Sequence, residues 1–472
     1  MKKAFLSVFI LAMMFAVSCG GDETTTPEPT EVVADVLPTE TNTAVSEPTA
    51  TEILPTNTAV SEPATATPLT TASEEATEVS EEETAEPSEE VTETAVPESA
   101  PTEESAAEAT ATSEGEEEAT ATAPPASNPP PATNVEAPPD NNYPEYGDKA
   151  GWENRIRVPT GFTVKYVGRV DGQPTSITFG PDGLLYIAVQ LGTIYTMNDN
   201  GGTGVYASGF NTPTGIAFRP GTSDLYVSSR LRNENVGGEA QISIANGRQI
   251  IGGIPCCYTF FHSANGIAFG PDGMGYVGIG ARADHGEKLD GSGQQDELHP
   301  MEASIIRFNP DTGSWTSYAR GTRNPYDIAW DANGQLWATD NMPDFDPPEV
   351  LHRIQPGAEH GYPWYDCDVC FSPPEGVTVN QPRITFVPSS SPTGITAYLA
   401  DQFPGYYNSL FLTLWSAFPG AQKVMLVGAG GTAPTNFATG FGAPIDVTVG
   451  PDGSLYVADW ATGIIFKISY TG

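Results

Sequence analysis

Basic residues are scarce in this chain, which holds 20 Lys and Arg against 60 Asp and Glu among its 472 residues. Residues 141–472 alone carry 31 acidic and 18 basic side chains. Their net charge of about −13 argues against nucleic acid or an anionic lipid surface as a partner, because both require a cationic face. A long helical period of apolar residues is also missing, which argues against a helix bundle. Gly and aromatic residues are plentiful in the last 325 residues or so, which are ample to bury a core.

Apolar runs long enough to span a bilayer are absent throughout. Two lysines precede a shorter apolar run over residues 4–17, and small residues follow. This pattern predicts a secretory signal over residues 1–18. The segment Ala16-Val17-Ser18-Cys19 resembles the bacterial lipobox, which implies cleavage before Cys19 and a lipid on its sulfur. We therefore expect an extracytoplasmic protein that meets the cell membrane only through this anchor; an ordinary signal peptide is the alternative.

Aromatic and basic residues are both absent between Gly20 and Asp140. This segment consists mainly of Thr, Ala, Glu, Pro and Ser, holds 29 of the 60 acidic residues, and repeats TNTAVSEP at 41–48 and 56–63. Such a composition cannot bury enough apolar surface to offset the entropy of ordering, and like charges with proline favour an extended chain. We expect a disordered, solvated stalk over residues 19–145, and a folded domain of about 325 residues after it.

Cysteine is rare, with five residues in the whole chain. Once Cys19 is assigned to the lipid, four remain: Cys256, Cys257, Cys367 and Cys370. An exported domain lies in an oxidising compartment, so disulfides are expected, although four cysteines allow three connectivities. A zinc site of four cysteines is the alternative, and the adjacent pair Cys256-Cys257 suits tetrahedral ligation poorly.

Six segments share one pattern, which is an apolar strand, a turn of Pro, Asp, Asn or Gly, and a second apolar strand. Their first apolar residues stand at 177, 216, 267, 328, 395 and 447. Four-stranded propeller blades repeat every 40 to 50 residues or so, plus insertions. We predict a six-bladed β-propeller over residues 146–472, closed by an N-terminal strand near Phe162 to Val167 that joins the last blade. A β-sandwich and a β-helix are the alternatives.

The residues just before each inner strand distinguish the blades. In a propeller these positions surround one end of the axis. We compare the two residues that stand five and four places before the first apolar residue of each repeat. In chain order they are Gly172 and Gln173, Asn211 and Thr212, His262 and Ser263, Arg323 and Asn324, Ser390 and Ser391, and Gly442 and Ala443. Only blades three and four place an ionisable side chain there, so His262, Arg323 and Asn324 are expected to meet.

These three residue types suit proton abstraction beside a carbonyl-like acceptor. A neutral histidine can take a hydroxyl proton, and a fixed guanidinium with an amide can stabilise a developing oxyanion. A histidine packed among aromatic rings and an arginine in a strand-end salt bridge are the alternatives. His285 and His360 are weaker candidates that are compatible with surface or packing roles.

An acidic loop follows the second strand of the fourth blade. It runs from Asp340 to Glu349, holds four carboxylates, and its prolines impose turns that expose backbone carbonyls. Hard oxygen ligands of this kind suit calcium better than zinc. A solvated acidic loop is the alternative.

These features resemble the soluble quinoprotein glucose and sorbosone dehydrogenases, which are six-bladed propellers that use pyrroloquinoline quinone (PQQ) with calcium. The resemblance is carried by Arg323-Asn324-Pro325, by Ala338-Thr339-Asp340-Asn341, by Gly361-Tyr362-Pro363, and by His262 ahead of Gly266-Ile267-Ala268-Phe269. It implies that His262 is the base for a sugar hydroxyl while hydride passes to the quinone. It also implies that Arg323 and Asn324 contact the quinone oxygens.

The resemblance further implies a calcium ion beside the cofactor, held by carbonyls at Met342 and Pro343. A nearby carboxylate, Asp346 or Glu349, would complete the site. Two positions depart from the family pattern: Ala443 stands where an arginine is frequent, and Trp415-Ser416 where a lysine or polar residue is expected. PQQ carries three carboxylates, so fewer basic partners should weaken its binding; Lys423 and Arg282 are candidates to compensate.

We therefore predict a PQQ-dependent dehydrogenase that oxidises an aldose or related polyol and passes electrons to an acceptor that the sequence does not identify. A non-catalytic propeller that binds carbohydrate or protein, having lost cofactor contacts, is the alternative. A propeller lactonase or other metal hydrolase would need acidic ligands from several blades, whereas this chain concentrates them in one loop.

Overall fold

The structure is a computed structural model, and it describes residues 134–231, 238–259, 261–288, 293, 298–343, 347–364 and 375–472. All of them belong to one compact unit within residues 113–472. The predictions for the signal sequence, the stalk up to residue 133, Cys19, Asp346, Cys367 and Cys370 lie outside the described residues. For residues 134–145 the predicted disordered stalk is wrong, because this segment packs on the domain: the Val135 amide donates to the Asn436 carbonyl at 3.0 Å, and Arg155 donates to the Asp140 carbonyl at 3.0 Å.

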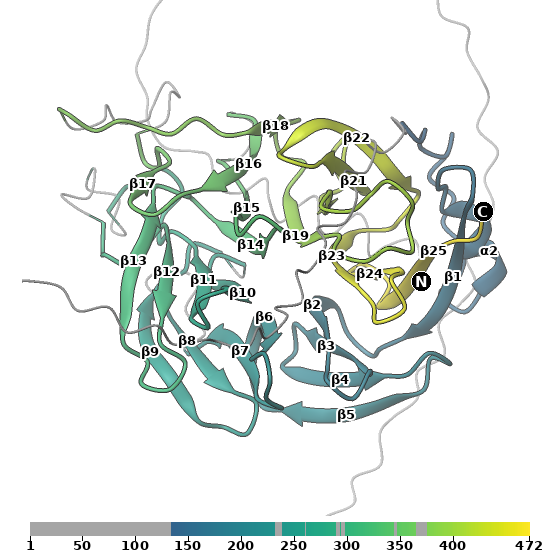
Figure 1. Ribbon diagram of the computed structural model, residues 1–472, viewed down its shortest axis with the longest axis horizontal. Coiled ribbons are helices and arrows are strands. Elements are labelled where there is room, and N and C mark those ends of the chain that lie inside the picture. Colours follow the sequence, from purple (N-terminus) through teal and green to yellow (C-terminus); the bar gives the residue numbers. More distant parts are fainter. Residues whose placement is uncertain are drawn as a thin grey trace, which may run out of the picture. The chain divides into compact units, whose positions relative to one another are not determined.

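Six β-sheets surround a common axis (Figure 1). The first three blades, from the axis outward, are β2 (Pro174–Phe179), β3 (Leu185–Val189), β4 (Thr193–Met197) and β5 (Thr203–Ser208); β6 (Asn211–Phe218), β7 (Leu225–Arg230), β8 (Glu239–Ile244) and β9 (Gln249–Pro255); and β10 (Ala264–Phe269), β11 (Gly275–Ile279), β12 (Ser304–Phe308), β13 (Trp315–Arg320) and β17 (Ala358–Glu359).

The other three blades are β14 (Pro325–Trp330), β15 (Leu336–Asp340), β16 (Glu349–Ile354) and β18 (Ile384–Phe386); β19 (Pro392–Ala397), β20 (Leu410–Leu414), β21 (Lys423–Gly428) and β22 (Thr432–Thr439); and β23 (Pro444–Val449), β24 (Leu455–Asp459), β25 (Ile464–Tyr470) and β1 (Phe162–Arg169). Each of the six sequence markers lies in an innermost strand. The predicted six-bladed propeller is therefore confirmed.

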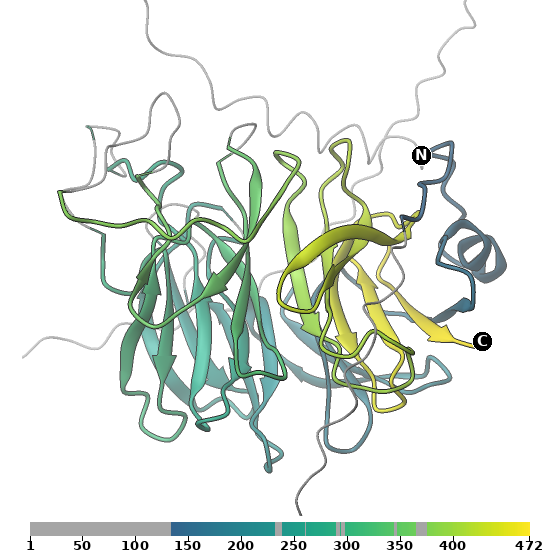
Figure 2. The ribbon, with the colours of Figure 1, turned by 45° about the horizontal axis from the view of Figure 1, so that its top comes forward.

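The N-terminal strand closes the ring, as predicted. β1 pairs antiparallel with β25 from Phe162 opposite Tyr470 to Arg169 opposite Ile464. A short helix, α2 (Lys149–Arg155), precedes it on the outer side of the ring (Figure 2) and buries Trp152 against Phe466. Within the described residues, no helix combines the length and apolar character needed to cross a membrane.

The Pro-Asp-Gly turns form as their sequence predicts. Gly183, Gly273 and Gly453 have φ between 72° and 79°, a region that glycine enters without steric cost. In two of these turns the aspartate also accepts a hydrogen bond from the tyrosine four residues later, at 3.0 Å for both Asp182 and Asp272. These short links fix the register of the first two strands of the blade.

Two carboxylates, a half-buried one on Asp327 and a buried one on Asp446, join neighbouring blades at the inner strands. Asp327 of β14 accepts from the Ile395 amide of β19 at 2.9 Å, and Asp446 of β23 accepts from the Ile177 amide of β2 at 2.6 Å. Glycines face them on the preceding blade: a Cβ at Gly266 or Gly394 would lie 2.0 or 2.1 Å from a carboxylate oxygen. Because glycine has no side chain, the carboxylates of Asp327 and Asp446 fit against these two positions.

Cys256 and Cys257 form a disulfide between adjacent residues, and both are fully buried. They follow β9 and lead toward the strand that begins blade three. The expectation of a disulfide is confirmed for this pair. Of the three connectivities that four cysteines allow, the structure shows the one in which Cys256 pairs with Cys257.

Candidate active site

The three residues predicted to act together lie together. His262 precedes β10 and Arg323-Asn324 precedes β14, on adjacent blades. Gly280, just beyond β11, lies between them: a Cβ there would be 2.8 Å from His262 Cα and 2.7 Å from Asn324 Oδ1. The absence of a side chain at position 280 therefore allows the two blades to bring these residues into one cluster.

His262 is a buried, neutral imidazole. Its side chain is 5 % exposed and packs edge-on against Tyr258, with ring centroids 5.3 Å apart. Burial, together with the charges of Arg323 and Arg230, holds the pKa of His262 well below its usual value. Its Nδ1 is buried and has no hydrogen-bond partner among the described residues. A neutral ring whose second nitrogen is unpaired can accept a proton.

Arg323 is fixed by the protein. Nε donates to the Asp284 carbonyl at 3.1 Å, Nη1 donates to the carbonyls of Asn341 and Met342 at 2.9 Å each, and Nη2 donates to the Asp284 carboxylate. The predicted alternative of a salt bridge is thus also present, with Asp284 as the partner. Four of the five guanidinium N–H groups are used, so the cation is held rigidly and retains one donor for a ligand.

Asn324 has an oriented amide. Its Oδ1 accepts from Asn265 Nδ2 at 2.8 Å inside the protein. The Nδ2 group of Asn324 makes no hydrogen bond with any described residue, so it remains as a donor for a ligand. The site therefore combines one open acceptor, on His262, with neutral and cationic donors on the next blade.

Both ends of the acidic loop include residues that are turned inward. Glu349 is 2 % exposed and accepts from the amides of Met342 at 2.8 Å and Ser391 at 3.3 Å. Burial raises its pKa to about 8. Met342 and Pro343 are buried as well. For these residues the solvated-loop alternative is wrong, because their polar groups are used within the blade.

No group of three or more His, Cys, Asp or Glu side chains in the described ranges is arranged to hold a metal. A calcium site here would therefore depend on backbone carbonyls. The Met342 carbonyl is shared, since it already accepts from Arg323. A carbonyl oxygen has a second lone pair, which leaves it able to ligate a cation.

The proposed compensating cations already have protein partners. Arg282 pairs with the fully buried Glu302 at 2.8 Å, and Lys423 Nζ donates to Asn436 at 3.1 Å. At the two departures from the family pattern, Trp415 and Ala443, the structure places two tryptophans nearby. Trp415 packs perpendicular to Trp460, with centroids 5.4 Å apart, and the Trp460 amide donates to the Ala443 carbonyl.

Several residues of the site were not predicted from the sequence. Asn265 and Arg230 act on the predicted side chains from a strand start and a strand end. Asp284, a weaker candidate beside His285 in the sequence, is the partner of Arg323. Asn265 lies three residues after His262, so its polar side chain at the start of a buried strand was an available signal. Of the weaker candidates, His285 lies 3.4 Å from the Asp284 carboxylate, whereas His360 packs against His352.

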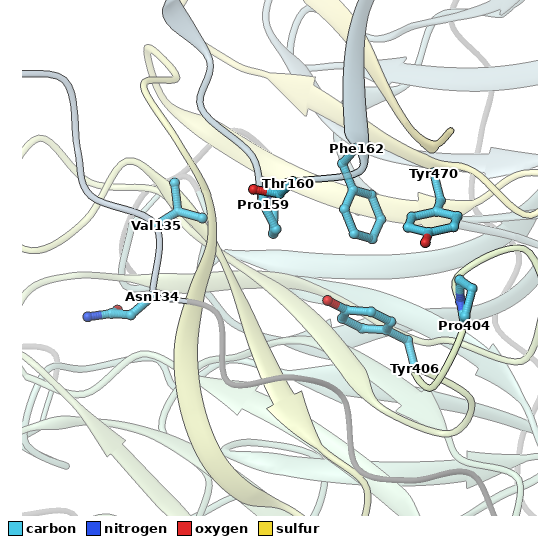
Figure 3. Close-up of a pocket in the computed structure, with 8 residues that line it drawn as sticks. All are labelled: Asn134, Val135, Pro159, Thr160, Phe162, Pro404, Tyr406 and Tyr470. Atoms are coloured by element: carbon cyan, nitrogen blue, oxygen red, sulfur yellow. The ribbon is translucent and has the colours of Figure 1, made fainter. Parts of the chain in front are cut away.

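A separate cavity of about 410 Å³ lies at the outer rim of the ring (Figure 3). Its walls include Phe162, Tyr406 and Tyr470, and none of its lining residues is charged or carries an imidazole. Proton abstraction has no candidate base there, so this cavity is not the predicted site.

The sequence matches the glucose/sorbosone dehydrogenase family over residues 230–467. The chain therefore belongs to this family, a class of oxidoreductases that act on sugars. A search of curated proteins finds no match.

Solved structures with the same fold include three sugar dehydrogenases. The PQQ-bound aldose sugar dehydrogenase from Streptomyces coelicolor is 20% identical (TM-score 0.50; 66% of this chain, 99% of that one). The PQQ domain of pyranose dehydrogenase from Coprinopsis cinerea, in its holo form, is 18% identical (TM-score 0.52; 66% and 97%). The soluble aldose sugar dehydrogenase from Escherichia coli, in its apo form, is 18% identical (TM-score 0.51; 66% and 99%).

Proposed function

We propose that this protein is an extracytoplasmic dehydrogenase that oxidises an aldose or a related polyol, using PQQ and calcium. The observation that carries the proposal is the cluster of His262, Arg323 and Asn324, in which a neutral imidazole with an open nitrogen lies beside two oriented donors. Membership of the glucose/sorbosone dehydrogenase family supports it.

The donor set fits the cofactor. A quinone oxygen needs hydrogen-bond donors, and the remaining N–H of Arg323 and the Nδ2 group of Asn324 are available for that purpose. When bound, PQQ supplies the acceptor for the two electrons of the alcohol, and calcium acts as a Lewis acid beside it. The carbonyls of Met342 and Pro343 would hold the calcium, with Asp346 or Glu349 as the carboxylate.

The chain's own residues would prepare the substrate. His262 would accept the hydroxyl proton at Nδ1, because burial and two neighbouring arginines keep its ring neutral. Arg323 is prevented from swinging by Asp284, so its charge stays directed at the site. Such preorganised donors stabilise developing negative charge without reorganisation.

Anchoring to the cell membrane through a lipid on Cys19 is part of the proposal. It is supported by the signal-like residues 1–18 and the lipobox-like segment before Cys19. A disulfide in the folded domain agrees with an oxidising compartment. Growth with a radiolabelled fatty acid should label the wild type and leave Cys19→Ser unlabelled; label in both would refute the anchor.

A second candidate function has one observation in its favour. Ala443 stands where the family pattern has an arginine and Trp415 where it has a lysine or polar residue, and the Trp415 ring packs against Trp460. A propeller with these changes could bind a sugar without oxidising it.

Reconstitution separates the two candidates. The purified domain is loaded with PQQ and Ca²⁺, and reduction of a dye is followed with a panel of aldoses and polyols. Turnover with at least one sugar supports the dehydrogenase. Saturable sugar binding with neither bound PQQ nor turnover supports the binding protein instead.

A further inference from the structure

A buried carboxylate holds the backbone of the Arg323-Asn324 pair. Asp340, the last residue of β15, accepts from the Arg323 amide at 3.0 Å and from the Asn324 amide at 2.7 Å. The carboxylate is fully buried. Each of its oxygens accepts from one of the two amides. The orientation of this carboxylate therefore fixes the backbone from which the side chains of Arg323 and Asn324 extend.

An imidazole from the next strand binds the same carboxylate. His352 Nε2 lies 3.2 Å from Asp340 Oδ2, and both groups are fully buried. Since Oδ2 already accepts from an amide, the imidazole is the donor. The other nitrogen, Nδ1, has no partner among the described residues.

A second imidazole fixes the plane of the first. The rings of His352 and His360 have centroids 4.5 Å apart and are inclined at 54°. His360 is 1 % exposed, and burial together with His352 lowers its pKa to about 3. It is therefore a neutral packing partner, held by its own amide on the Arg320 carbonyl at 2.8 Å.

Blade six contains the same clamp without the functional side chains. Asp459 occupies the place of Asp340, because each stands opposite the proline that begins its inner strand. It accepts from the amides of Gly442 at 2.7 Å and Ala443 at 2.9 Å. Its further partner is local: Thr462 Oγ1 donates at 2.9 Å. The fold can thus build this turn with a nearby hydroxyl and does not need an imidazole.

We propose that His352 is a positioning residue for the proposed oxidation: its Nε2–H orients Asp340, and through that carboxylate it fixes the guanidinium of Arg323 and the amide of Asn324. The inference rests on the proposed function. It assigns a role to a histidine that contacts neither substrate nor cofactor. In blade six, Thr462 does the equivalent structural work with no effect on the chemistry.

The test compares His352→Ala, His352→Gln and Thr462→Ala in the domain loaded with PQQ and Ca²⁺. We expect His352→Ala to lower kcat at least about tenfold while KM for the sugar changes less than about threefold, because a loss of alignment in the transition state acts on kcat. Gln can donate from a similar place, so His352→Gln should recover most of kcat. Thr462→Ala should lower the melting temperature similarly and leave kcat unchanged.

Amide hydrogen exchange provides a readout that does not need activity. His352→Ala should accelerate exchange at Arg323 and Asn324, and Thr462→Ala at Gly442 and Ala443. Unchanged exchange at Arg323 and Asn324, a kcat within twofold of wild type, or equal losses of kcat in both alanine variants would overturn the proposal. If the wild type itself reduces no dye, the proposed function fails, while the exchange rates still support or refute the clamp.

Discussion

His262 offers the sharpest test at the scale of single residues. If its open Nδ1 is the base, His262→Asn should lower kcat by about 10²- to 10⁴-fold, the range that general base catalysis supplies. PQQ should still bind, because the donors on Arg323 and Asn324 remain. Dye reduction gives kcat, and an absorbance titration gives the dissociation constant of the cofactor. A variant that keeps more than a tenth of the activity would contradict the assignment.

The pH profile tests the state of the same imidazole. Activity needs the neutral ring, and the pKa of His262 lies well below its usual value of 6.5. As pH rises, kcat/KM should increase through that lowered pKa and then stay level, so the acid limb should be complete below pH 6.5. Steady-state rates between pH 4 and 9 measure it. A limb centred at or above 6.5 would show that the ring is not buried between two arginines in the working enzyme.

Gly280 should matter for activity more than its size suggests. An alanine methyl there would lie under 3 Å from Asn324 Oδ1 and from the His262 backbone, so one blade must shift. We expect Gly280→Ala to lower kcat at least tenfold. Gly147→Ala is the matched control, because a Cβ at Gly147 meets nothing within 4 Å. Equal activity in the two variants would mean that the separation of His262 and Asn324 is not critical.

At the scale of elements, the inner strands carry a pH-dependent stability term. Burial raises the pKa of Asp446 to about 7 and that of Asp327 well above its usual value. The folded state therefore binds these protons more tightly than the unfolded state. This contribution is complete below about pH 4 and is lost as pH rises toward 7, by up to about 1.4 kcal/mol per pH unit and group.

Urea unfolding of Asp446→Asn measures this contribution. The free energy of unfolding of the wild type should fall more steeply between pH 5 and 7 than that of the variant. Asp452→Asn is the control with the opposite sign, since hydrogen bonding to Lys467 and to Ser454 lowers the pKa of Asp452. Parallel curves for wild type and Asp446→Asn would show that the inner carboxylate does not titrate on folding.

The same strands show what the sequence could predict. Marker residues such as Ile177 and Ile328 recur because each inner strand must bury the same face, so the number of blades and the closing strand followed from spacing. His262, Arg323 and Asn324 followed because equivalent positions of a ring converge. By contrast, Asn265, Arg230 and His352 act on the site from neighbouring strands. Such contacts are set by three-dimensional packing and leave no periodic trace in the chain.

At the scale of the whole domain, the ring is closed by one seam between the two ends of the chain. β1 gives β25 its outer partner, and Tyr166 of β1 enters the same core cluster as Trp152, Phe466 and Ile468. Without β1, the backbone groups of β25 would form an open sheet edge and this apolar cluster would meet water. The closing seam should therefore dominate the cooperative stability of the propeller.

Two truncated chains test this seam. A chain that begins at Asn134 keeps β1 and α2 and lacks the stalk up to residue 133, which contains no aromatic or basic residue from Gly20 on; its melting temperature should equal that of the mature protein. A chain that begins at Val170 lacks both elements and should melt about 10 °C lower or more, because several kcal/mol of burial are lost and each costs roughly 2–4 °C in a domain of this size. Calorimetry of the two chains decides it. A single transition at the same temperature in both would place the stability in the individual blades, and the ring would then need no closing strand.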